Sequence, residues 1–256
     1  RQIMALSQRE IDLLLREKYK GRKTRAFRVD LKRLTLGEPL DYVIGWREFL
    51  GVKIDLKFRP LIPRVETEFW VEPAIGAIKD RTAELGRPVA ILDLFAGSGC
   101  VGLAVLKHCL DATVVLADRD LTSLKQLRRN LKLNQPSKRV KVIESDIFSG
   151  LSNQYFDFIL ANPPYVPTFG RGSKIQKSVK NYEPAEALFA GPDGLKIIRR
   201  FFQQAKAHLK PGGQIWLEFG VGQKSALVKL IRQGAYSNFN FQRDQFGRWR
   251  FVVISL

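Results

Sequence analysis

Residues 89–102 read VAILDLFAGSGCVG, and this stretch decides the fold. Its first part, 89–94, is a short apolar run that predicts a buried strand. The glycine-rich segment that follows ends the strand in a tight turn and leads into a helix over 100–109. A strand, a turn and a helix in this order predict an α/β domain with a parallel sheet.

The same alternation of strands and helices continues to the end of the chain. Further strands are predicted at 113–117, 140–144, 156–161 and 214–219, and further helices at 121–134, 195–209 and 225–233. Two last strands, at 239–241 and 249–254, are expected to form an antiparallel pair. Because strands alternate with helices, we expect helices on both faces of the sheet.

The chain upstream of residue 67 has a different character. Residues 1–35 are predicted to be helical, and the sequence SQRE from Ser7 matches a capping box. The apolar face of this segment is small, so we expect it to dock on the main domain or on a segment upstream of it. A break at 37–40 is followed by a predicted hairpin at 46–58 and by a helix that starts near Thr67. The expected units are a helical segment (1–35), a linker with the hairpin (36–66) and the main α/β domain (67–256).

The composition is that of an ordinary soluble globular protein. Of its 256 residues, 45% are hydrophobic and 27% are charged, which is enough for one large domain and a small appendage. No apolar run approaches the ~18 residues that cross a bilayer, so we expect no membrane partner. Cys100 and Cys109 are too few for a disulfide framework and fit no common zinc spacing. We therefore expect no metal and a cytoplasmic location, or the mitochondrial matrix if the protein is eukaryotic.

The net charge of +18 is concentrated at the two ends of the chain. Residues 1–35 contribute +7 and residues 194–256 contribute +9, so the long middle stretch is nearly neutral. Basic flanks of this kind indicate a polyanionic partner, such as ribosomal RNA or a complex that contains it. Simple solubility explains them equally well, and the two interpretations stay open.

The glycine loop and the strand after it predict a site for a nucleoside ligand. Residues 97–102 satisfy the pattern G-x-G-x-x-G, and Asp118 stands at the end of the next strand, where it can accept hydrogen bonds from ribose hydroxyls. A dehydrogenase that binds a dinucleotide fits this fragment as well. Asp93, at the end of the first strand, favours the cationic S-adenosylmethionine because it would repel a pyrophosphate. Asp146, at the end of the third strand, either borders the adenine or caps a turn.

Residues 156–165 read FDFILANPPY, a strand that runs directly into two prolines. Each proline fixes its φ and lacks an N–H, so the turn is stiff and its carbonyls have no local donors. The side-chain oxygen of Asn162 and the carbonyl of Pro163 can accept both N–H bonds of a planar NH2 group, while Tyr165 lies against its flat face. Acceptors aimed at a developing positive charge stabilise the transition state more than the ground state, without a metal or a strong base. We therefore predict methyl transfer to a planar nitrogen, with Asn162, Pro163 and Tyr165 as the catalytic residues.

Several motifs follow one another in the order typical of one family. They are GEPLDYVIG (37–45), IPRVETE (62–68), the glycine loop, Asp118, NPPY (162–165) and YEP (182–184). On these motifs the chain, from about residue 36 to 256, resembles the HemK/PrmC family of protein-glutamine methyltransferases. The tetrapeptide also occurs in adenine-N6 DNA methyltransferases and in some guanine RNA methyltransferases, whereas the first two segments are much more specific.

The resemblance implies a seven-stranded, Rossmann-like class I S-adenosylmethionine-dependent methyltransferase fold. It also implies a small helical N-terminal part for substrate docking and a connecting β-hairpin. The substrate would be the glutamine of the Gly-Gly-Gln motif in a class I peptide chain release factor, methylated on its side-chain amide nitrogen by a monomeric enzyme, with S-adenosylhomocysteine as the product. The release factor would dock in the cleft between the N-terminal part and the catalytic domain, flanked by residues 166–192.

The resemblance also implies the residues of the site. The cofactor-binding positions are Asp93, Phe95, Ala96, Gly97, Ser98, Gly99, Asp118, Asp146, Ile147 and Asn162. The substrate-binding positions are Asn162, Pro163, Pro164, Tyr165, Arg64 and Glu68. The chain departs from the family pattern at Val65, at Phe95-Ala96 and at Ile147, where an aromatic residue is usual. We therefore expect stacking on the adenine to be lost or to move to Phe148.

Two other functions remain open from the sequence. One is methylation of an amino group in RNA or DNA, at adenine N6 or guanine N2, which the tetrapeptide and the basic charge both allow. The other is a non-catalytic, ribosome-binding relative that has kept the fold, which would bind the cofactor without turnover.

Overall fold

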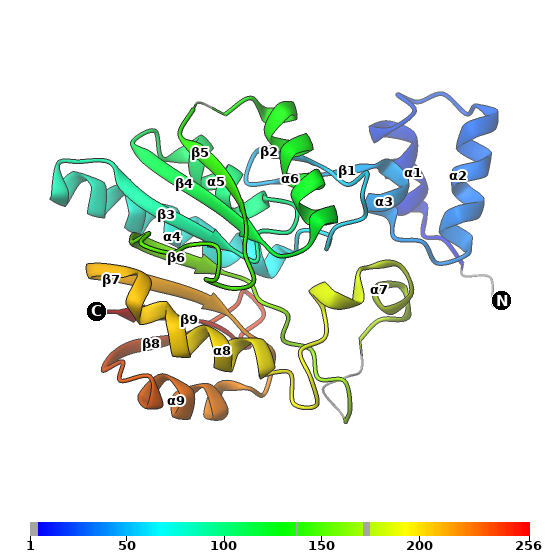
Figure 1. Ribbon diagram of the computed structural model, residues 1–256. Helices are drawn as coiled ribbons and strands as arrows, with labels where there is room; N and C mark the ends of the chain where they lie inside the picture. Colours follow the sequence, from blue (N-terminus) through cyan, green and yellow to red (C-terminus); the bar gives the residue numbers. More distant parts are fainter. Residues whose placement is uncertain (1–4, 137, 171–174) are drawn as a thin grey trace.

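The computed structural model describes residues 5–136, 138–170 and 175–256, and Figure 1 shows its two parts. A small helical part lies at the N-terminal side, and a larger α/β part carries the rest of the chain. Residues 1–4 of the expected N-terminal segment and residues 171–174 of the expected cleft stretch lie outside the described residues. Within the described ranges, no helix is long and apolar enough to cross a membrane.

One mixed sheet of seven strands forms the centre of the α/β part, as the sequence predicted. Its strands are β3 (Val89–Leu94), β4 (Ala112–Asp118), β5 (Val140–Glu144), β6 (Phe156–Ala161), β7 (Leu209–Glu218), β8 (Asn238–Arg243) and β9 (Trp249–Ser255). The spatial order is β5-β4-β3-β6-β7-β9-β8. The first five strands in this order are parallel, whereas β9 runs antiparallel to both of its neighbours. The order reverses between β3 and β6, the position where ligands bind in open α/β sheets.

Helices cover both faces of the sheet. They are α4 (Val65–Leu85), α5 (Cys100–His108), α6 (Leu121–Asn134), α8 (Lys196–Gln204) and α9 (Lys224–Gln233), with the short helices α7 (Lys177–Tyr182), η2 (Ala185–Ala187) and η3 (Ala205–His208). Helices α4, α5 and α6 share one apolar core with the sheet, and α8 and α9 share the other. Along β3, Ile91 faces the first core and Leu92 faces the second, because successive side chains point to opposite faces of a strand.

Several element boundaries differ from the sequence predictions, most of them by one or two residues. The helix expected at 195–209 divides into α8 and η3, and β7 starts at Leu209 rather than at 214. The strand therefore includes Pro211 and the two glycines after it, and its pairing with β6 is irregular near Phe156. Helix α4 begins at Val65, two residues before the expected start.

The N-terminal segment forms two helices, α1 (Gln8–Glu17) and α2 (Arg25–Thr35), and α3 (Leu40–Ile44) packs against them. The predicted capping box is present, since the Ser7 side chain accepts from the backbone of Glu10 and the Glu10 side chain accepts from the backbone of Ser7. The three helices enclose an apolar cluster of their own, formed by Leu14, Phe27, Leu34 and Val43. Helix α3, which follows residues 1–35, thus supplies part of the apolar surface on which this face packs.

The predicted hairpin is formed by β1 (Trp46–Phe49) and β2 (Val52–Asp55). Its turn residues Leu50 and Gly51 both have positive φ, the conformation that two-residue hairpin loops need. Helix α6 holds the hairpin against the main domain. The side-chain oxygen of Asn130 accepts from the backbone N–H of Asp55 at 2.8 Å, and Asn130 also donates to the carbonyl of Ser98 at 2.8 Å. One buried side chain thereby connects the hairpin to the glycine loop.

Candidate functional site

A cavity of about 240 Å³ opens at the carboxyl ends of β3, β4 and β6. Nine of the predicted site residues line it: Arg64, Asp93, Phe95, Ala96, Gly97, Ser98, Asp118, Asn162 and Pro164. Residues 58–63 also line it, together with Pro184, Glu186 and Ala187. The structure therefore brings together the glycine loop, the two acids and the tetrapeptide, although Asp93 and Asn162 lie 69 residues apart in the sequence.

The glycine loop adopts a backbone that most residues avoid. Phe95, Gly97 and Gly99 have φ of 64°, 54° and 81°. At Gly99 a Cβ would lie 2.6 Å from a methyl group of Leu127, and at Gly102 it would lie 2.2 Å from Leu116. The first glycine of the motif therefore shapes the loop beside the cavity, whereas the other two allow α5 to pack closely on the sheet and on α6.

Two carboxylates face the cavity without a cationic partner. The Asp93 side chain accepts from the Gly102 N–H at 2.8 Å, and Asp118 accepts from the Gly97 N–H at 2.8 Å. Burial raises the pKa of Asp93 to about 7, and the nearby charge of Asp118 acts in the same direction. Burial also raises the pKa of Asp118. Neither acid takes part in an ion pair within the described ranges, so the cavity is suited to a ligand that brings positive charge.

The tetrapeptide 162–165 is held from its two ends. Asn162 Nδ2 donates to Thr67 Oγ1 at 3.2 Å, and the Tyr165 hydroxyl donates to Glu218 Oε1 at 2.9 Å. The backbone carbonyl of Tyr165 also accepts from the Gln223 side chain at 2.9 Å. Asn162 and Pro164 line the cavity, whereas Pro163 is buried and the Tyr165 side chain is directed to Glu218.

Arg64 lies at the cavity wall and is fixed by Glu183. The Glu183 carboxylate accepts from Arg64 Nη2 at 2.7 Å and from the backbone N–H of Ile62 at 3.0 Å. Two motifs that are separate in the sequence, 62–68 and 182–184, are thus joined by one buried acid. Glu68, the other predicted substrate residue of the first motif, does not line the cavity, because it is half-buried beside the β1–β2 hairpin, where burial raises its pKa.

Three predicted cofactor positions do not line this cavity. Gly99 serves packing, as described above. Asp146 is bound by Arg200, whose Nη2 lies 2.7 Å from its carboxylate. Ile147 is buried in the core that underlies α8 and α9. Phe148, the alternative stacking residue, is buried against His208, with ring centroids 4.6 Å apart.

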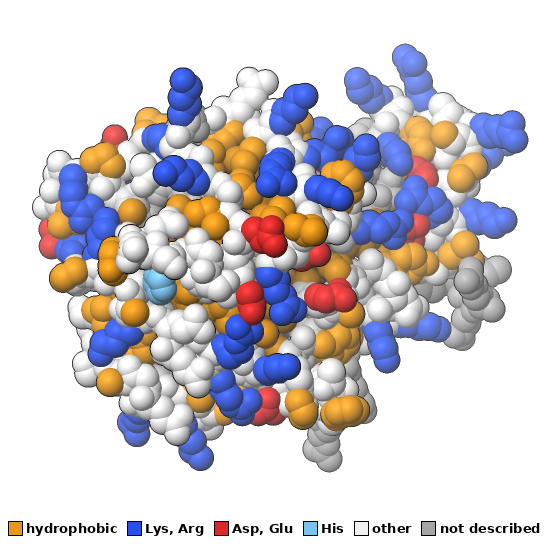
Figure 2. Space-filling model, viewed as in Figure 1, with side chains coloured by type: hydrophobic (Ala, Val, Ile, Leu, Met, Phe, Trp, Pro, Cys, Tyr) orange, Lys and Arg blue, Asp and Glu red, His pale blue; other side chains and the backbone are white. Residues whose placement is uncertain are grey.

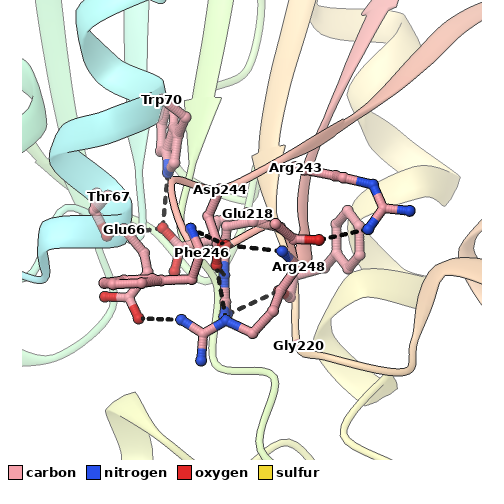
Figure 3. Close-up of polar contacts among 12 residues, drawn as sticks. Glu66, Thr67, Trp70, Glu218, Gly220, Arg243, Asp244, Phe246 and Arg248 are labelled. Atoms are coloured by element: carbon pink, nitrogen blue, oxygen red, sulfur yellow. Dashed lines mark hydrogen bonds and ion pairs between the residues drawn. The ribbon is translucent and has the colours of Figure 1, made fainter.

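Several residues of the site were not assigned a role from the sequence. Phe58 lines the cavity while 38% exposed, and it follows directly after the hairpin. Thr67 lies within a motif that was recognised, but nothing in the sequence indicated that its hydroxyl reaches Asn162. Glu218 is completely buried at the end of β7, and it accepts from both Thr67 and Trp70 (Figure 3). An acid at the carboxyl end of a buried strand was the signal that could have identified it.

The cavity shows no sign of a metal centre. Among the residues that the structure describes, no group of three or more His, Cys, Asp or Glu side chains is placed to hold a metal ion. Cys100, the thiol at the cavity wall, has a raised pKa because it is buried and near Asp93. A raised pKa keeps a thiol protonated and therefore unreactive.

Comparison with known proteins identifies the family. Residues 82–181 match the family model "Methyltransferase small domain". The chain is 34% identical to the release factor glutamine methyltransferase of Rhodopirellula baltica, over 89% of this chain and 77% of that protein. It is 35% identical to the protein of the same name from Thermodesulfovibrio yellowstonii, over 88% of this chain and 78% of that protein.

Solved structures share the fold at low sequence identity. The T. thermophilus 16S rRNA methyltransferase RsmC, in complex with AdoMet and guanosine, matches with a TM-score of 0.56 and 20% identity, over 82% of this chain and 49% of that chain. The human methyltransferase 10 domain containing protein matches with a TM-score of 0.54 and 18% identity, over 80% of this chain and 89% of that chain. At this identity they support the class I methyltransferase fold alone. The relatives of 34% and 35% identity show that the chain belongs to the release factor glutamine methyltransferase family.

Proposed function

We propose that the protein transfers a methyl group from S-adenosylmethionine to the side-chain amide nitrogen of the glutamine in the Gly-Gly-Gln motif of class I peptide chain release factors. Its membership of the family supports this function. The observation that carries the proposal is the position of Asn162, which lines the same cavity as Asp93 and Asp118. Two acids suited to a cation and a carboxamide acceptor thus line one small space at the ends of adjacent strands.

The residues of the cavity fit S-adenosylmethionine. Asp93, buried and without a cationic partner among the described residues, would hold the positive end of the cofactor. Asp118, at the end of β4, would accept from the ribose hydroxyls. The loop from Phe95 to Ser98 would lie along the cofactor, with its backbone brought close by Gly97. Phe58 gives the cavity an exposed aromatic face, and we propose that it packs on the adenine in place of the residue after Asp146.

Asn162 and Pro163 would orient the glutamine amide. The cofactor supplies an electrophilic methyl group, and the amide nitrogen is a weak nucleophile because its lone pair is delocalised. Two acceptors, Asn162 Oδ1 and the Pro163 carbonyl, would bind the two N–H groups and hold the nitrogen in line with the methyl group. They favour the transition state because positive charge develops on the nitrogen there. The proton released from the nitrogen passes to solvent, so no strong base is required.

The release factor would dock between the helical part and the α/β part. This side of the cavity is formed by residues 58–64 and by Pro184–Ala187, and its position is fixed by contacts between distant segments. Tyr182 donates to the carbonyl of Leu36 at 3.2 Å, and Arg59 pairs with Glu38 at 2.6 Å. We propose that Arg64 contacts the backbone of the Gly-Gly-Gln loop, since it lines the cavity while Glu183 fixes its position.

The decisive experiment offers three substrates to one enzyme. The protein is incubated with radiolabelled S-adenosylmethionine and, in parallel, a release factor, total RNA and DNA. We expect label on the release factor, and we expect it to disappear when the glutamine of its Gly-Gly-Gln motif is replaced by glutamate. Label on RNA alone would show that the substrate is a nucleic acid, and cofactor binding with no label on any substrate would indicate a non-catalytic relative.

A basic surface on the N-terminal part supports an additional contact with RNA. Exposed Lys20, Arg22 and Lys23 lie in the connection between α1 and α2, and exposed Arg25 and Arg28 follow on α2. Figure 2 shows Lys and Arg side chains crowded over this part of the molecule. Like charges at this density repel one another and attract a phosphate backbone. We propose that this surface binds ribosomal RNA, and that reversing these charges to glutamate weakens binding to RNA without lowering turnover on an isolated release factor.

A further inference from the structure

Glu218 is a buried carboxylate that joins both ends of the tetrapeptide 162–165. It lies at the end of β7 and is 0% exposed. Its Oε2 atom accepts from Trp70 Nε1 at 2.7 Å and from Thr67 Oγ1 at 2.7 Å, as Figure 3 shows. Its Oε1 atom accepts from the Tyr165 hydroxyl at 2.9 Å. Thr67 and Trp70 both belong to the first turns of α4, so this contact also fixes that helix against the sheet.

The chemistry of these groups determines the direction of each hydrogen bond. An indole N–H can only donate, so Glu218 Oε2 must act as an acceptor toward Trp70. As a carboxylate, Glu218 can only accept, so the Thr67 hydroxyl, 2.7 Å from the same oxygen, donates its one proton to Glu218. Burial raises the pKa of Glu218, and the hydrogen bonds from Trp70, Thr67 and Tyr165 lower it. Thr67 Oγ1 then has only lone pairs left for Asn162. It can accept from the NH2 group of Asn162 but cannot donate to the carbonyl oxygen.

We propose that Glu218 and Thr67 are positioning residues that set the orientation of the Asn162 carboxamide. This inference rests on the proposed function, because the orientation matters for a substrate that presents an NH2 group. Because Asn162 Nδ2 donates to Thr67, Asn162 Oδ1 is the atom that can face the cavity. Among the described residues, Oδ1 has no hydrogen-bond partner. The opposite orientation would set an NH2 group against the NH2 group of the substrate and remove one of its two acceptors.

The orientation can be measured in the free protein by NMR. With ¹⁵N-asparagine labelling, the Asn162 side-chain amide signals are assigned by their loss in Asn162→Ala. We expect two well-resolved amide protons, one of them slow to exchange because it is bound to buried Thr67. Thr67→Val should make the two amide protons exchange at similar rates. Thr67→Ser should restore the slow exchange of one proton, because the hydroxyl returns. Thr82→Val is the matched control, since it removes a hydroxyl from the same helix at a distance from the site. Amide signals that do not respond to Thr67→Val would overturn the proposal.

Turnover tests the functional consequence. Thr67→Val should lower kcat by about tenfold to a hundredfold, less than the loss of about a hundredfold to a thousandfold expected when a transition-state contact is removed outright, with little change in cofactor affinity. Thr67→Ser should recover most of the loss, and Thr82→Val should behave as the wild type. In an Asn162→Ala background, Thr67→Val should cost nothing further, because Thr67 acts through Asn162.

The two proposals can fail separately. Independent, multiplicative losses in the double variant would overturn the positioning role while leaving the proposed function intact. If the wild type does not methylate the release factor, the proposed function is wrong, and the NMR experiment still decides the orientation of Asn162.

Discussion

Replacing Asp93 with asparagine is expected to stabilise the cofactor-free protein and to weaken cofactor binding at the same time. Burial raises the pKa of Asp93 from 3.8 to about 7, a shift of about three units. Each unit corresponds to about 1.4 kcal/mol, so the ionised side chain should cost the fold about 4 kcal/mol at pH 8. Because the folded-state pKa is the higher one, this cost develops as the pH rises from about 4 to 7 and is complete above that range. Asparagine cannot ionise, and its side-chain oxygen can still accept from Gly102.

The binding of the cofactor should show the opposite dependence. A cationic ligand needs the carboxylate form of Asp93, and that form is lost as the pH falls through about 7. The dissociation constant of the wild type should therefore rise about fivefold from pH 7 to pH 6 and about tenfold for each further unit. At pH 7, binding should release about half a proton. Asp93→Asn should bind more weakly at pH 8, without this pH dependence and without release of a proton.

Urea unfolding at pH 8 measures the first effect, and isothermal titration calorimetry in two buffers of different ionisation enthalpy measures the second. Asp80→Asn, on an exposed position of α4, is the control for the change in net charge. It should alter neither quantity. If Asp93→Asn unfolds at the same urea concentration as the wild type, and the wild type binds equally well at pH 6 and pH 8, the electrostatic reasoning about this cavity is wrong.

Three further predictions follow from individual contacts. Asn162→Ala should lower kcat on the release factor by about a hundredfold to a thousandfold, because the amide acts mainly in the transition state. Cofactor affinity, measured by calorimetry, should fall only modestly. Near-normal turnover would contradict the role of Asn162. Gly102→Ala should lower the free energy of unfolding by about 1–3 kcal/mol in urea titrations, since the added methyl group would lie 2.2 Å from Leu116; an unchanged midpoint would mean that α5 moves freely. Burial raises the pKa of Asp157, but hydrogen bonds from Arg87, the Ala90 N–H and Lys210 lower it to about 2. Asp157→Asn should therefore lower the free energy of unfolding by about 2 kcal/mol at pH 7. In thermal unfolding, the difference in stability between wild type and variant should vanish as the pH falls from 4 to 2.

Local sequence patterns were sufficient for most of the secondary structure. Four elements have the predicted bounds: the strands 89–94, 140–144 and 156–161 and the helix 121–134. The pattern of apolar and polar residues along each element predicts its type and extent. The boundary near Leu209 was wrong for a related reason. Pro211 and the following glycines resemble a loop, but here they lie within β7 beside β6, a contact that no local pattern records.

The functional site was likewise predictable in part from local sequence, whereas its side-chain partners depend on tertiary contacts. Sequence alone predicted Asp93, Asp118 and Asn162 as site residues, since each ends a predicted parallel strand and such ends meet at one edge of a sheet. The structure placed these residues around one cavity, whereas Asp146 is bound by Arg200 and Tyr165 is directed to Glu218. These partners are supplied by other elements, so the position of the residue on its own strand could not predict them.

The paired loops of the sequence, the glycine turn and the tetrapeptide, determined the fold class and the kind of chemistry, because both motifs constrain the backbone through their own residues. The tertiary structure alone decided how Asn162 is oriented. Thr67 and Glu218 are 151 residues apart, and Arg64 and Glu183 are 119 apart, yet each pair is in hydrogen-bond contact at 2.7 Å. Hydrogen bonds of this kind depend on donors and acceptors that meet only when the chain is folded, and they leave no periodic trace in the sequence.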